Sequence, residues 1–159
     1  MFRYNERMRK NVHGSSCELP AVPRKRKNNR SRRYPFQGDF TWKGVRAEDY
    51  KTGGSDWEGI LRQVIIGSRG ETAKFSLRYF EIAPGGYSSH ETHEHEHVVV
   101  GIRGEGKALL NRRAVRVGFL DVVYVSPGTP HRLFNPFSEP FGFFCIVNRE
   151  RDHPRPVGR

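Results

Sequence analysis

The chain has 159 residues, which is enough for one domain with one hydrophobic core and a tail. No run approaches the roughly 18–20 apolar residues of a membrane span, and the N-terminal region lacks the apolar stretch of a signal peptide. Two cysteines, Cys17 and Cys145, are too few for a disulfide framework, and Cys145 in the apolar run 143–147 is expected to be a buried free thiol. These features favour a cytoplasmic protein.

The net charge of +11 is concentrated at the N-terminus. Residues 1–33 hold eleven Lys or Arg and two acids, a net charge of +9, whereas the remaining 126 residues hold seventeen and fifteen, a net charge of +2. Residues 1–35 also lack apolar periodicity, so we expect a disordered polybasic tail before a folded domain over residues 36–159. Such a tail either contacts nucleic acid through phosphate groups or is a solvated extension without a partner.

From Phe40 onward, short β-type runs alternate with Gly, Pro and Asn. The predicted strands are 61–66, 73–82, 97–102, 107–110, 114–117, 121–125 and 141–147, and the second is expected to end at Pro84-Gly85-Gly86. No segment of helical length shows an apolar stripe with a period of about 3.6 residues. Many short strands with turn residues between them predict an all-β sandwich or barrel.

Histidines are clustered just before the predicted strand 97–102. His90, His93, His95 and His97 fall within eight residues, and His131 follows a later Pro-Gly turn. Since alternate residues of a strand share a face, one face would carry Glu91, His93, His95 and His97, and the other His90, Glu94 and Glu96. Imidazole and carboxylate groups suit zinc, iron, manganese, nickel or copper, so we predict one divalent transition metal. The alternative, an exposed polar strand without a ligand, fits four clustered histidines poorly.

Two segments resemble the sequence motifs of the cupin family. Residues 84–106 contain Pro-Gly-Gly-Tyr-Ser-Ser, the histidine run and Gly-Ile-Arg-Gly-Glu-Gly, and are similar to the first motif, G-x5-H-x-H-x3,4-E-x6-G. Residues 120–135, with Ser-Pro-Gly-Thr-Pro-His at their centre, are similar to the second, roughly G-x5-P-x-G-x2-H-x3-N. The resemblance covers about residues 70–148 and implies a single-domain cupin, a jelly-roll β-barrel with the basic tail attached.

The resemblance also implies a set of metal ligands. Counting back from Gly104 by the spacing of the motif places a ligand at His97, where the family usually has glutamate, and the preceding pair at Glu91 and His93. The implied metal ligands are Glu91, His93, His97 and His131.

Alternatives to this set stay open. A backbone bulge before His93 would let His90 replace Glu91, or His95 replace His97. Leu120 is a further departure, because it stands where the second motif has glycine, and Gly118 is then the candidate for the turn.

The cupin resemblance implies a metal-dependent enzyme, of oxygenase (dioxygenase) or isomerase type, acting on a small oxygenated or carboxylated metabolite. The candidate substrate pocket consists of Arg78, Tyr124, Phe134 and Phe143, with Arg78 placed to hold an anionic group. His95 and Tyr124 are candidates for proton transfer. The alternative function is a non-catalytic module that binds or senses a small molecule. A homodimer is also implied, to which an N-terminal strand around residues 40–50, beginning with the run 40–45, would contribute.

Overall fold

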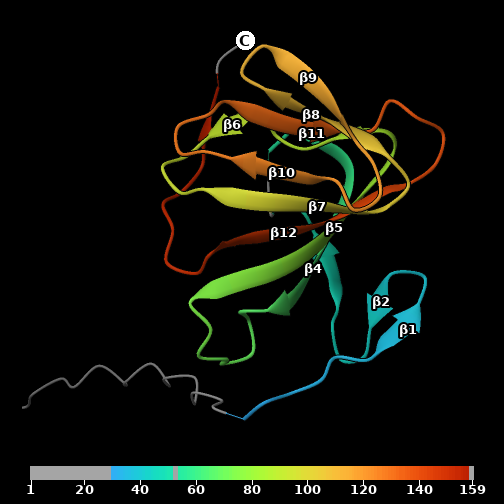
Figure 1. Cartoon of the computed structure of the whole chain (residues 1–159), viewed down its shortest axis with the longest axis vertical. Coiled ribbons are helices and arrows are strands. Elements are labelled where there is room, and N and C mark those ends of the chain that lie inside the picture. The colour runs from blue at the N-terminus through green and yellow to red at the C-terminus, as the bar shows by residue number, and fades with distance from the viewer. Residues whose placement is uncertain (1–29, 52–53, 158–159) are drawn as a thin grey trace, which may run out of the picture.

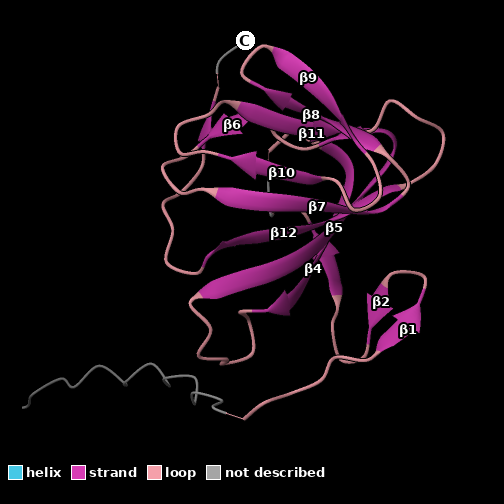
Figure 2. Ribbon diagram, in the orientation of Figure 1, coloured by secondary structure: helices cyan, strands magenta, loops and turns pink. Residues whose placement is uncertain are grey.

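The computed structural model describes residues 30–51 and 54–157, in which every regular element is a strand (Figures 1 and 2). The strands are β1 (Phe36–Gly38), β2 (Thr41–Trp42), β3 (Ala47–Asp49), β4 (Glu58–Ile66), β5 (Phe75–Tyr87), β6 (Glu91–Thr92), β7 (His97–Arg103), β8 (Gly106–Leu110), β9 (Arg113–Val117), β10 (Val122–Val125), β11 (His131–Phe134), β12 (Phe141–Asn148) and β13 (Arg155–Pro156). Within these ranges there is accordingly no apolar helix that could cross a membrane. Most of the predicted tail, residues 1–29, lies outside the described residues.

Eleven strands form one antiparallel sheet that curls into a nearly closed barrel. One side follows the order β10-β7-β12-β5-β4-β3, and the other consists of β9, β8, β11, β6 and β13. Figure 1 shows β8, β9 and β11 stacked over β10, β7 and β12. The prediction of an all-β jelly-roll barrel is therefore confirmed.

Strand β5 joins the two sides of the barrel. The predicted C-terminal end of this strand is wrong. The sequence Pro84-Gly85-Gly86 does not end the strand, which continues to Tyr87 and pairs there with Phe134 of β11. Gly85 has a φ of 78°, and a Cβ on Gly86 would lie 2.7 Å from the carbonyl oxygen of Glu58. Because glycine tolerates this conformation and this close approach, the strand turns a corner instead of stopping.

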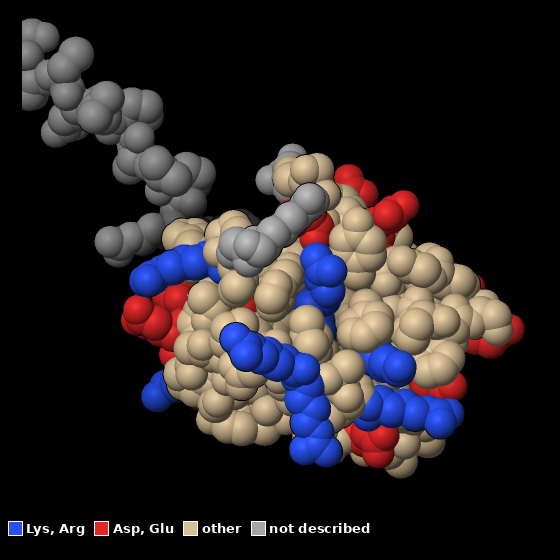
Figure 3. All heavy atoms as spheres, turned by 90° about the horizontal axis from the view of Figure 1, so that it is seen from above, with Lys and Arg blue, Asp and Glu red and all other residues tan. Residues whose placement is uncertain are grey.

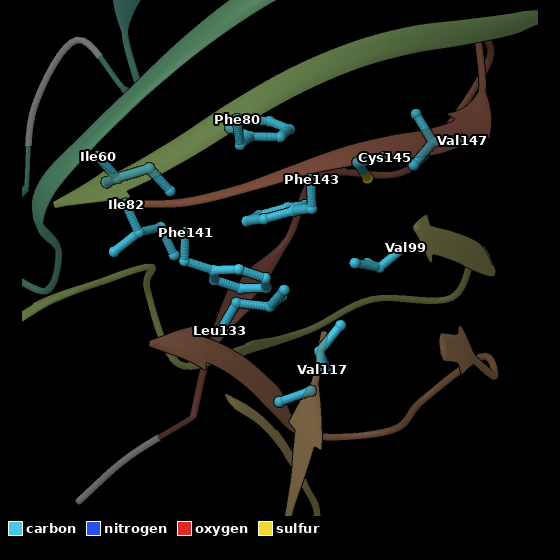
Figure 4. Packing of buried hydrophobic residues seen from close by; sticks show 11 residues of the cluster. Ile60, Phe80, Ile82, Val99, Val117, Leu133, Phe141, Phe143, Cys145 and Val147 are labelled. Carbon is cyan, nitrogen blue, oxygen red and sulfur yellow. The ribbon is translucent and has the colours of Figure 1, made fainter. Parts of the chain in front are cut away.

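The apolar interior is formed by alternate residues of the main strands. Figure 4 shows Phe80 of β5 facing Phe143 of β12, with Cys145 between Phe143 and Val147. The rings of Phe80 and Phe143 are stacked with centroids 5.5 Å apart. Cys145 is 2 % exposed and has a free thiol, as predicted. Several of these core residues, including Phe80, Phe143 and Cys145, also border a cavity lined by polar side chains.

A hairpin of β1 and β2 covers part of the outer face of the sheet. Trp42 contacts the rings of Tyr79 and Phe144, and Phe40 stacks on Tyr79 at 5.6 Å. Tyr79 is thereby completely buried although it points away from the barrel interior. Within the strand predicted around residues 40–50, two separate segments are extended: residues 41 and 42 pair with β1, and β3 pairs with β4 of the barrel.

The surface of the barrel carries charges of both signs. Figure 3 shows Lys and Arg side chains next to Asp and Glu side chains on the face seen from above. Several charged side chains of the barrel are paired, including Arg116 with Glu105 and Arg155 with Glu94. The mixture agrees with the small net charge of residues 34–159, and it gives this face no single-sign field of the kind that attracts nucleic acid.

Leu120 adopts the left-handed conformation expected of the glycine it replaces. Its φ is 65°, whereas Gly118 has no positive φ, so the turn is made at Leu120 itself. Its amide donates to the carbonyl of Gly101 over 2.8 Å, which fixes this conformation, and its side chain is 62 % exposed. A left-handed residue with a Cβ costs about 1–2 kcal/mol.

We expect Leu120→Gly to be more stable than Leu120→Ala, by about 1 kcal/mol. Both variants remove the same exposed side chain, but only glycine removes the Cβ that opposes a positive φ. Urea unfolding of the two variants measures the difference in free energy. An alanine variant as stable as the glycine variant would contradict the backbone explanation.

Candidate metal centre

His131 begins β11, and the turn before it fixes its position. Gly128 has a φ of 73° in this turn, and its amide donates to the carbonyl of His93 over 2.7 Å. The Nδ1 atom of His131 lies 2.9 Å from the carbonyl oxygen of Thr129. Because a carbonyl oxygen only accepts, this hydrogen bond places the hydrogen on Nδ1 and leaves the lone pair on Nε2.

His93 lies at the start of a loop that Asp152 holds in place. The Nδ1 atom of His93 is 2.6 Å from the carbonyl oxygen of His95, so its lone pair is also on Nε2. The carboxylate of Asp152 accepts from the amides of Glu94 and His95 and contacts Nδ1 of His95 at 2.5 Å. The ring of His95 stacks on that of His93, with centroids 3.7 Å apart.

His97 is the first residue of β7 and is deeply buried, at 7 % exposure. Its Nδ1 atom lies 3.2 Å from Sγ of Cys145, on the neighbouring strand β12. Its Nε2 atom is buried and has no hydrogen-bond partner among the described residues. A buried nitrogen without a partner costs free energy unless a ligand satisfies it.

His93, His97 and His131 form a compact group whose ligand atoms lie within 4.8 Å of one another. Burial lowers the pKa of all three below the usual value for histidine, and that of His97 to about 2. Repulsion from the neighbouring imidazoles adds to the effect for His93 and His97. The three rings are therefore neutral near pH 7, as metal ligands must be. Three neutral imidazoles with Nδ1 occupied and Nε2 available fit a divalent transition metal.

A cavity of about 70 Å³ adjoins these histidines. Glu91, His93, His95 and His97, the residues predicted to share one face, all border it, although residues 93–96 are not in a strand. Glu94 and Glu96 are exposed, and His90 borders a separate depression. The other bordering residues are Tyr50, Ile60, Arg78, Phe80, Ser88, His131, Leu133, Phe143, Cys145, Arg151 and Pro154.

Two of the predicted pocket residues border this cavity and two lie elsewhere. Arg78 and Phe143 line it from β5 and β12. Tyr124 points out of the barrel from β10 and is 60 % exposed, while Phe134 borders a shallow depression beside Gly85. Tyr124 is therefore too far out to transfer a proton at the histidines.

Glu91 borders the cavity but is engaged elsewhere. Its carboxylate forms an ion pair with Nζ of Lys51 at 2.7 Å, and Lys51 also donates to the hydroxyl of Ser89. Among the described residues the compact group contains histidines alone. The role of Glu91 as a fourth ligand stays a prediction.

Several residues that border or support the site were not predicted as site residues, among them Cys145, Arg151 and Asp152. Cys145 was expected only as a core thiol, and its position beside His97 depends on the pairing of β12 with β7. Arg151 and Asp152 follow β12 in a segment without periodicity, so the sequence alone gives no signal for them. They reach the histidines because the chain folds back along β6, where Arg155 pairs with Thr92.

Comparison with known proteins agrees with this architecture. The family described as Cupin domain matches residues 78–147. A protein of Rhodospirillum rubrum, named 1-methylthio-D-xylulose 5-phosphate methylsulfurylase, is 39% identical over 122 residues, which cover 76% of this chain and 77% of the relative. This chain belongs to the cupin family.

Solved cupin structures are also similar to this cupin. A cupin-2 domain from Rhodospirillum rubrum has 36% identity and a TM-score of 0.69, over 78% of this chain and 82% of that one. A cupin 2 conserved barrel protein from Rhodopseudomonas palustris has 33% identity and a TM-score of 0.68, over 74% and 80% of the two chains. These relatives extend over most of the barrel and not only over the two motifs.

Alanine substitution should separate the metal ligands from the other histidines. We expect His93→Ala, His97→Ala and His131→Ala to lose most of the bound metal, because each removes one of three converging nitrogens. His95→Ala and the exposed control His153→Ala should retain it. Elemental mass spectrometry of untagged protein gives the metal content, and thermal unfolding checks that each variant folds. Retention of full metal content in His97→Ala, or its loss in His95→Ala, would show that a different set binds the metal.

The contact between Cys145 and His97 should affect metal affinity. We expect Cys145→Ala to weaken binding about tenfold, since partners that orient a ligating histidine contribute 10- to 100-fold. Cys145→Ser should bind more tightly than the alanine variant, because its hydroxyl restores a partner for Nδ1. Competition with a chelator measures both dissociation constants. Equal affinities in wild type, serine and alanine variants would mean that the thiol does not orient His97.

Proposed function

We propose that this cupin is a metal-dependent enzyme acting on a small oxygenated metabolite, of the ketose phosphate class that appears in the name of its Rhodospirillum rubrum relative. The observation that carries the proposal is the arrangement of His93, His97 and His131. Their Nδ1 atoms have partners within the protein, and Nε2 of His97 is buried without one. Such a site binds a metal ion and leaves coordination positions for a substrate.

The metal would supply Lewis acidity toward a carbonyl oxygen or a water molecule. The chain itself supplies groups for proton transfer. His95 borders the cavity, and Asp152 holds its Nδ1, so proton transfer to or from a substrate would use its Nε2. Tyr50 also borders the cavity; burial, aided by the nearby charge of Glu91, raises its pKa above the usual value, so its hydroxyl remains a donor. These groups favour proton transfer next to a carbonyl, as in isomerase-type chemistry.

An oxygenase is the second candidate, because three imidazoles also suit iron, nickel and copper, the metals of oxygen chemistry. A non-catalytic binding module is the third, since a cupin barrel hosts many functions. The requirement for oxygen separates the first two, and the absence of any turnover identifies the third.

The test uses the full chain loaded in turn with Mn²⁺, Fe²⁺, Ni²⁺ or Zn²⁺, and 1-methylthio-D-xylulose 5-phosphate as substrate. Proton NMR follows the substrate under nitrogen and under air, with and without 2-mercaptoethanol to accept a sulfur group. We expect consumption with at least one metal, independent of oxygen, that stops on addition of a chelator. His93→Ala should reduce the rate at least 100-fold, because it removes a metal ligand.

Three results would change this assignment. Consumption only under air would favour the oxygenase. Binding of the compound without conversion, with every metal, would favour the binding module. Turnover in metal-free protein would contradict the metal-dependent mechanism. The homodimer, the contact of the tail with nucleic acid and the cytoplasmic location stay predictions.

A further inference from the structure

Arg78 and Arg151 border the histidine cavity, and within the described ranges neither forms an ion pair with an acid. Arg78 is half-buried on β5, and its Nε is buried without a hydrogen-bond partner. Both guanidinium groups thus face the same cavity, and in agreement with this the pKa of Arg151 is lowered by partial burial of its guanidinium and by repulsion from Arg78. Two cations beside one cavity, without an acidic partner, favour the binding of an anion.

The acids near this cavity are already neutralised. Glu91, which is the one acid among the bordering residues of the described chain, is paired with Lys51 at 2.7 Å. Asp152, next to Arg151, is bound to the loop of His95. The positive charge on this side of the cavity is therefore available to a ligand.

Arg78 is also held in place before any ligand binds. Its Nη2 donates to Sγ of Cys145 over 3.2 Å, and its guanidinium lies over the ring of Phe80, 5.1 Å from the centroid. Arg151 is anchored more loosely, by a bond of 3.2 Å from its Nη1 to the carbonyl of Asn148, and it is exposed at the mouth. A half-buried guanidinium inside the cavity and an exposed one at its mouth suit a group that enters from solvent.

We propose that Arg78 and Arg151 form the binding subsite for the phosphate group of the substrate, while the other end of the substrate faces His93, His97 and His131. The inference rests on the proposed function for the reacting end, but its residues are distinct from the metal ligands. A phosphate monoester carries up to two negative charges and accepts hydrogen bonds from several directions, which matches two guanidiniums better than a single carboxylate does.

The test compares ligands that differ only in the phosphate. Calorimetry on the full chain measures the binding of D-xylulose 5-phosphate, D-xylulose and inorganic phosphate to wild type, Arg78→Gln and Arg151→Gln. Arg112→Gln, which removes an exposed arginine outside the cavity, is the matched control for charge. We expect each cavity variant to bind the phosphate ester roughly 10- to 100-fold more weakly, with the affinity for D-xylulose, the metal content and the melting temperature unchanged.

The two proposals fail in different ways. If both cavity variants bind D-xylulose 5-phosphate as wild type does, or if Arg112→Gln weakens it equally, the subsite is wrong even when turnover is observed. If the phosphate ester binds through the two arginines but no substrate is converted, the result supports the phosphate subsite and contradicts the enzymatic function. Equal weakening for D-xylulose and its phosphate would show that the arginines act on the shape of the cavity and not on the anion.

Discussion

Neutral imidazoles packed inside an apolar barrel impose the main constraint on this molecule. A buried ring that is neutral still carries one N–H group, and that group needs an acceptor. For His93 and His131 the acceptors are carbonyls two residues away, so short local turns satisfy them. For His97, inside a regular strand, the local backbone is engaged in the sheet, and the partner is the thiol of Cys145 on the next strand. The need for an acceptor at each buried N–H group therefore accounts for the turns that hold His93 and His131 and for the pairing of β7 with β12 beside His97.

This requirement explains why the two sides of the barrel must be joined firmly. His97 belongs to β7 in one side, whereas His131 belongs to β11 in the other. Their separation depends on β5, which pairs with β12 and also with β11 after its bend at Gly85 and Gly86. The amide of Gly128 adds a direct link to the carbonyl of His93. Contacts between residues far apart in sequence thus place three imidazole nitrogens within 4.8 Å of one another.

The sequence predicted the parts of this arrangement that have a period or a motif. Alternation along 91–97 identified four residues that border the cavity, and the turn before His131 identified the third ring of the group. It did not predict the bend in β5, because Pro84-Gly85-Gly86 ends a strand as readily as it bends one. It also did not predict the left-handed Leu120, since a leucine carries no signal for a positive φ. Arg151 and Asp152 approach the histidines through a return of the chain that only tertiary packing determines.

The distribution of charge then connects the histidines to the arginines. The family usually places a glutamate where this chain has His97, so the group of three contributes no negative charge to a bound ion. Glu91 could neutralise such an ion only by giving up its ion pair with Lys51. While that pair persists, a divalent ion would keep its full charge and polarise a carbonyl strongly. Both the negative end and the carbonyl group of an anionic substrate would be attracted to that ion. In the proposed subsite, Arg78 and Arg151 would remove this ambiguity, because they border the same cavity and would offer the negative end a separate position, leaving the uncharged end to the metal.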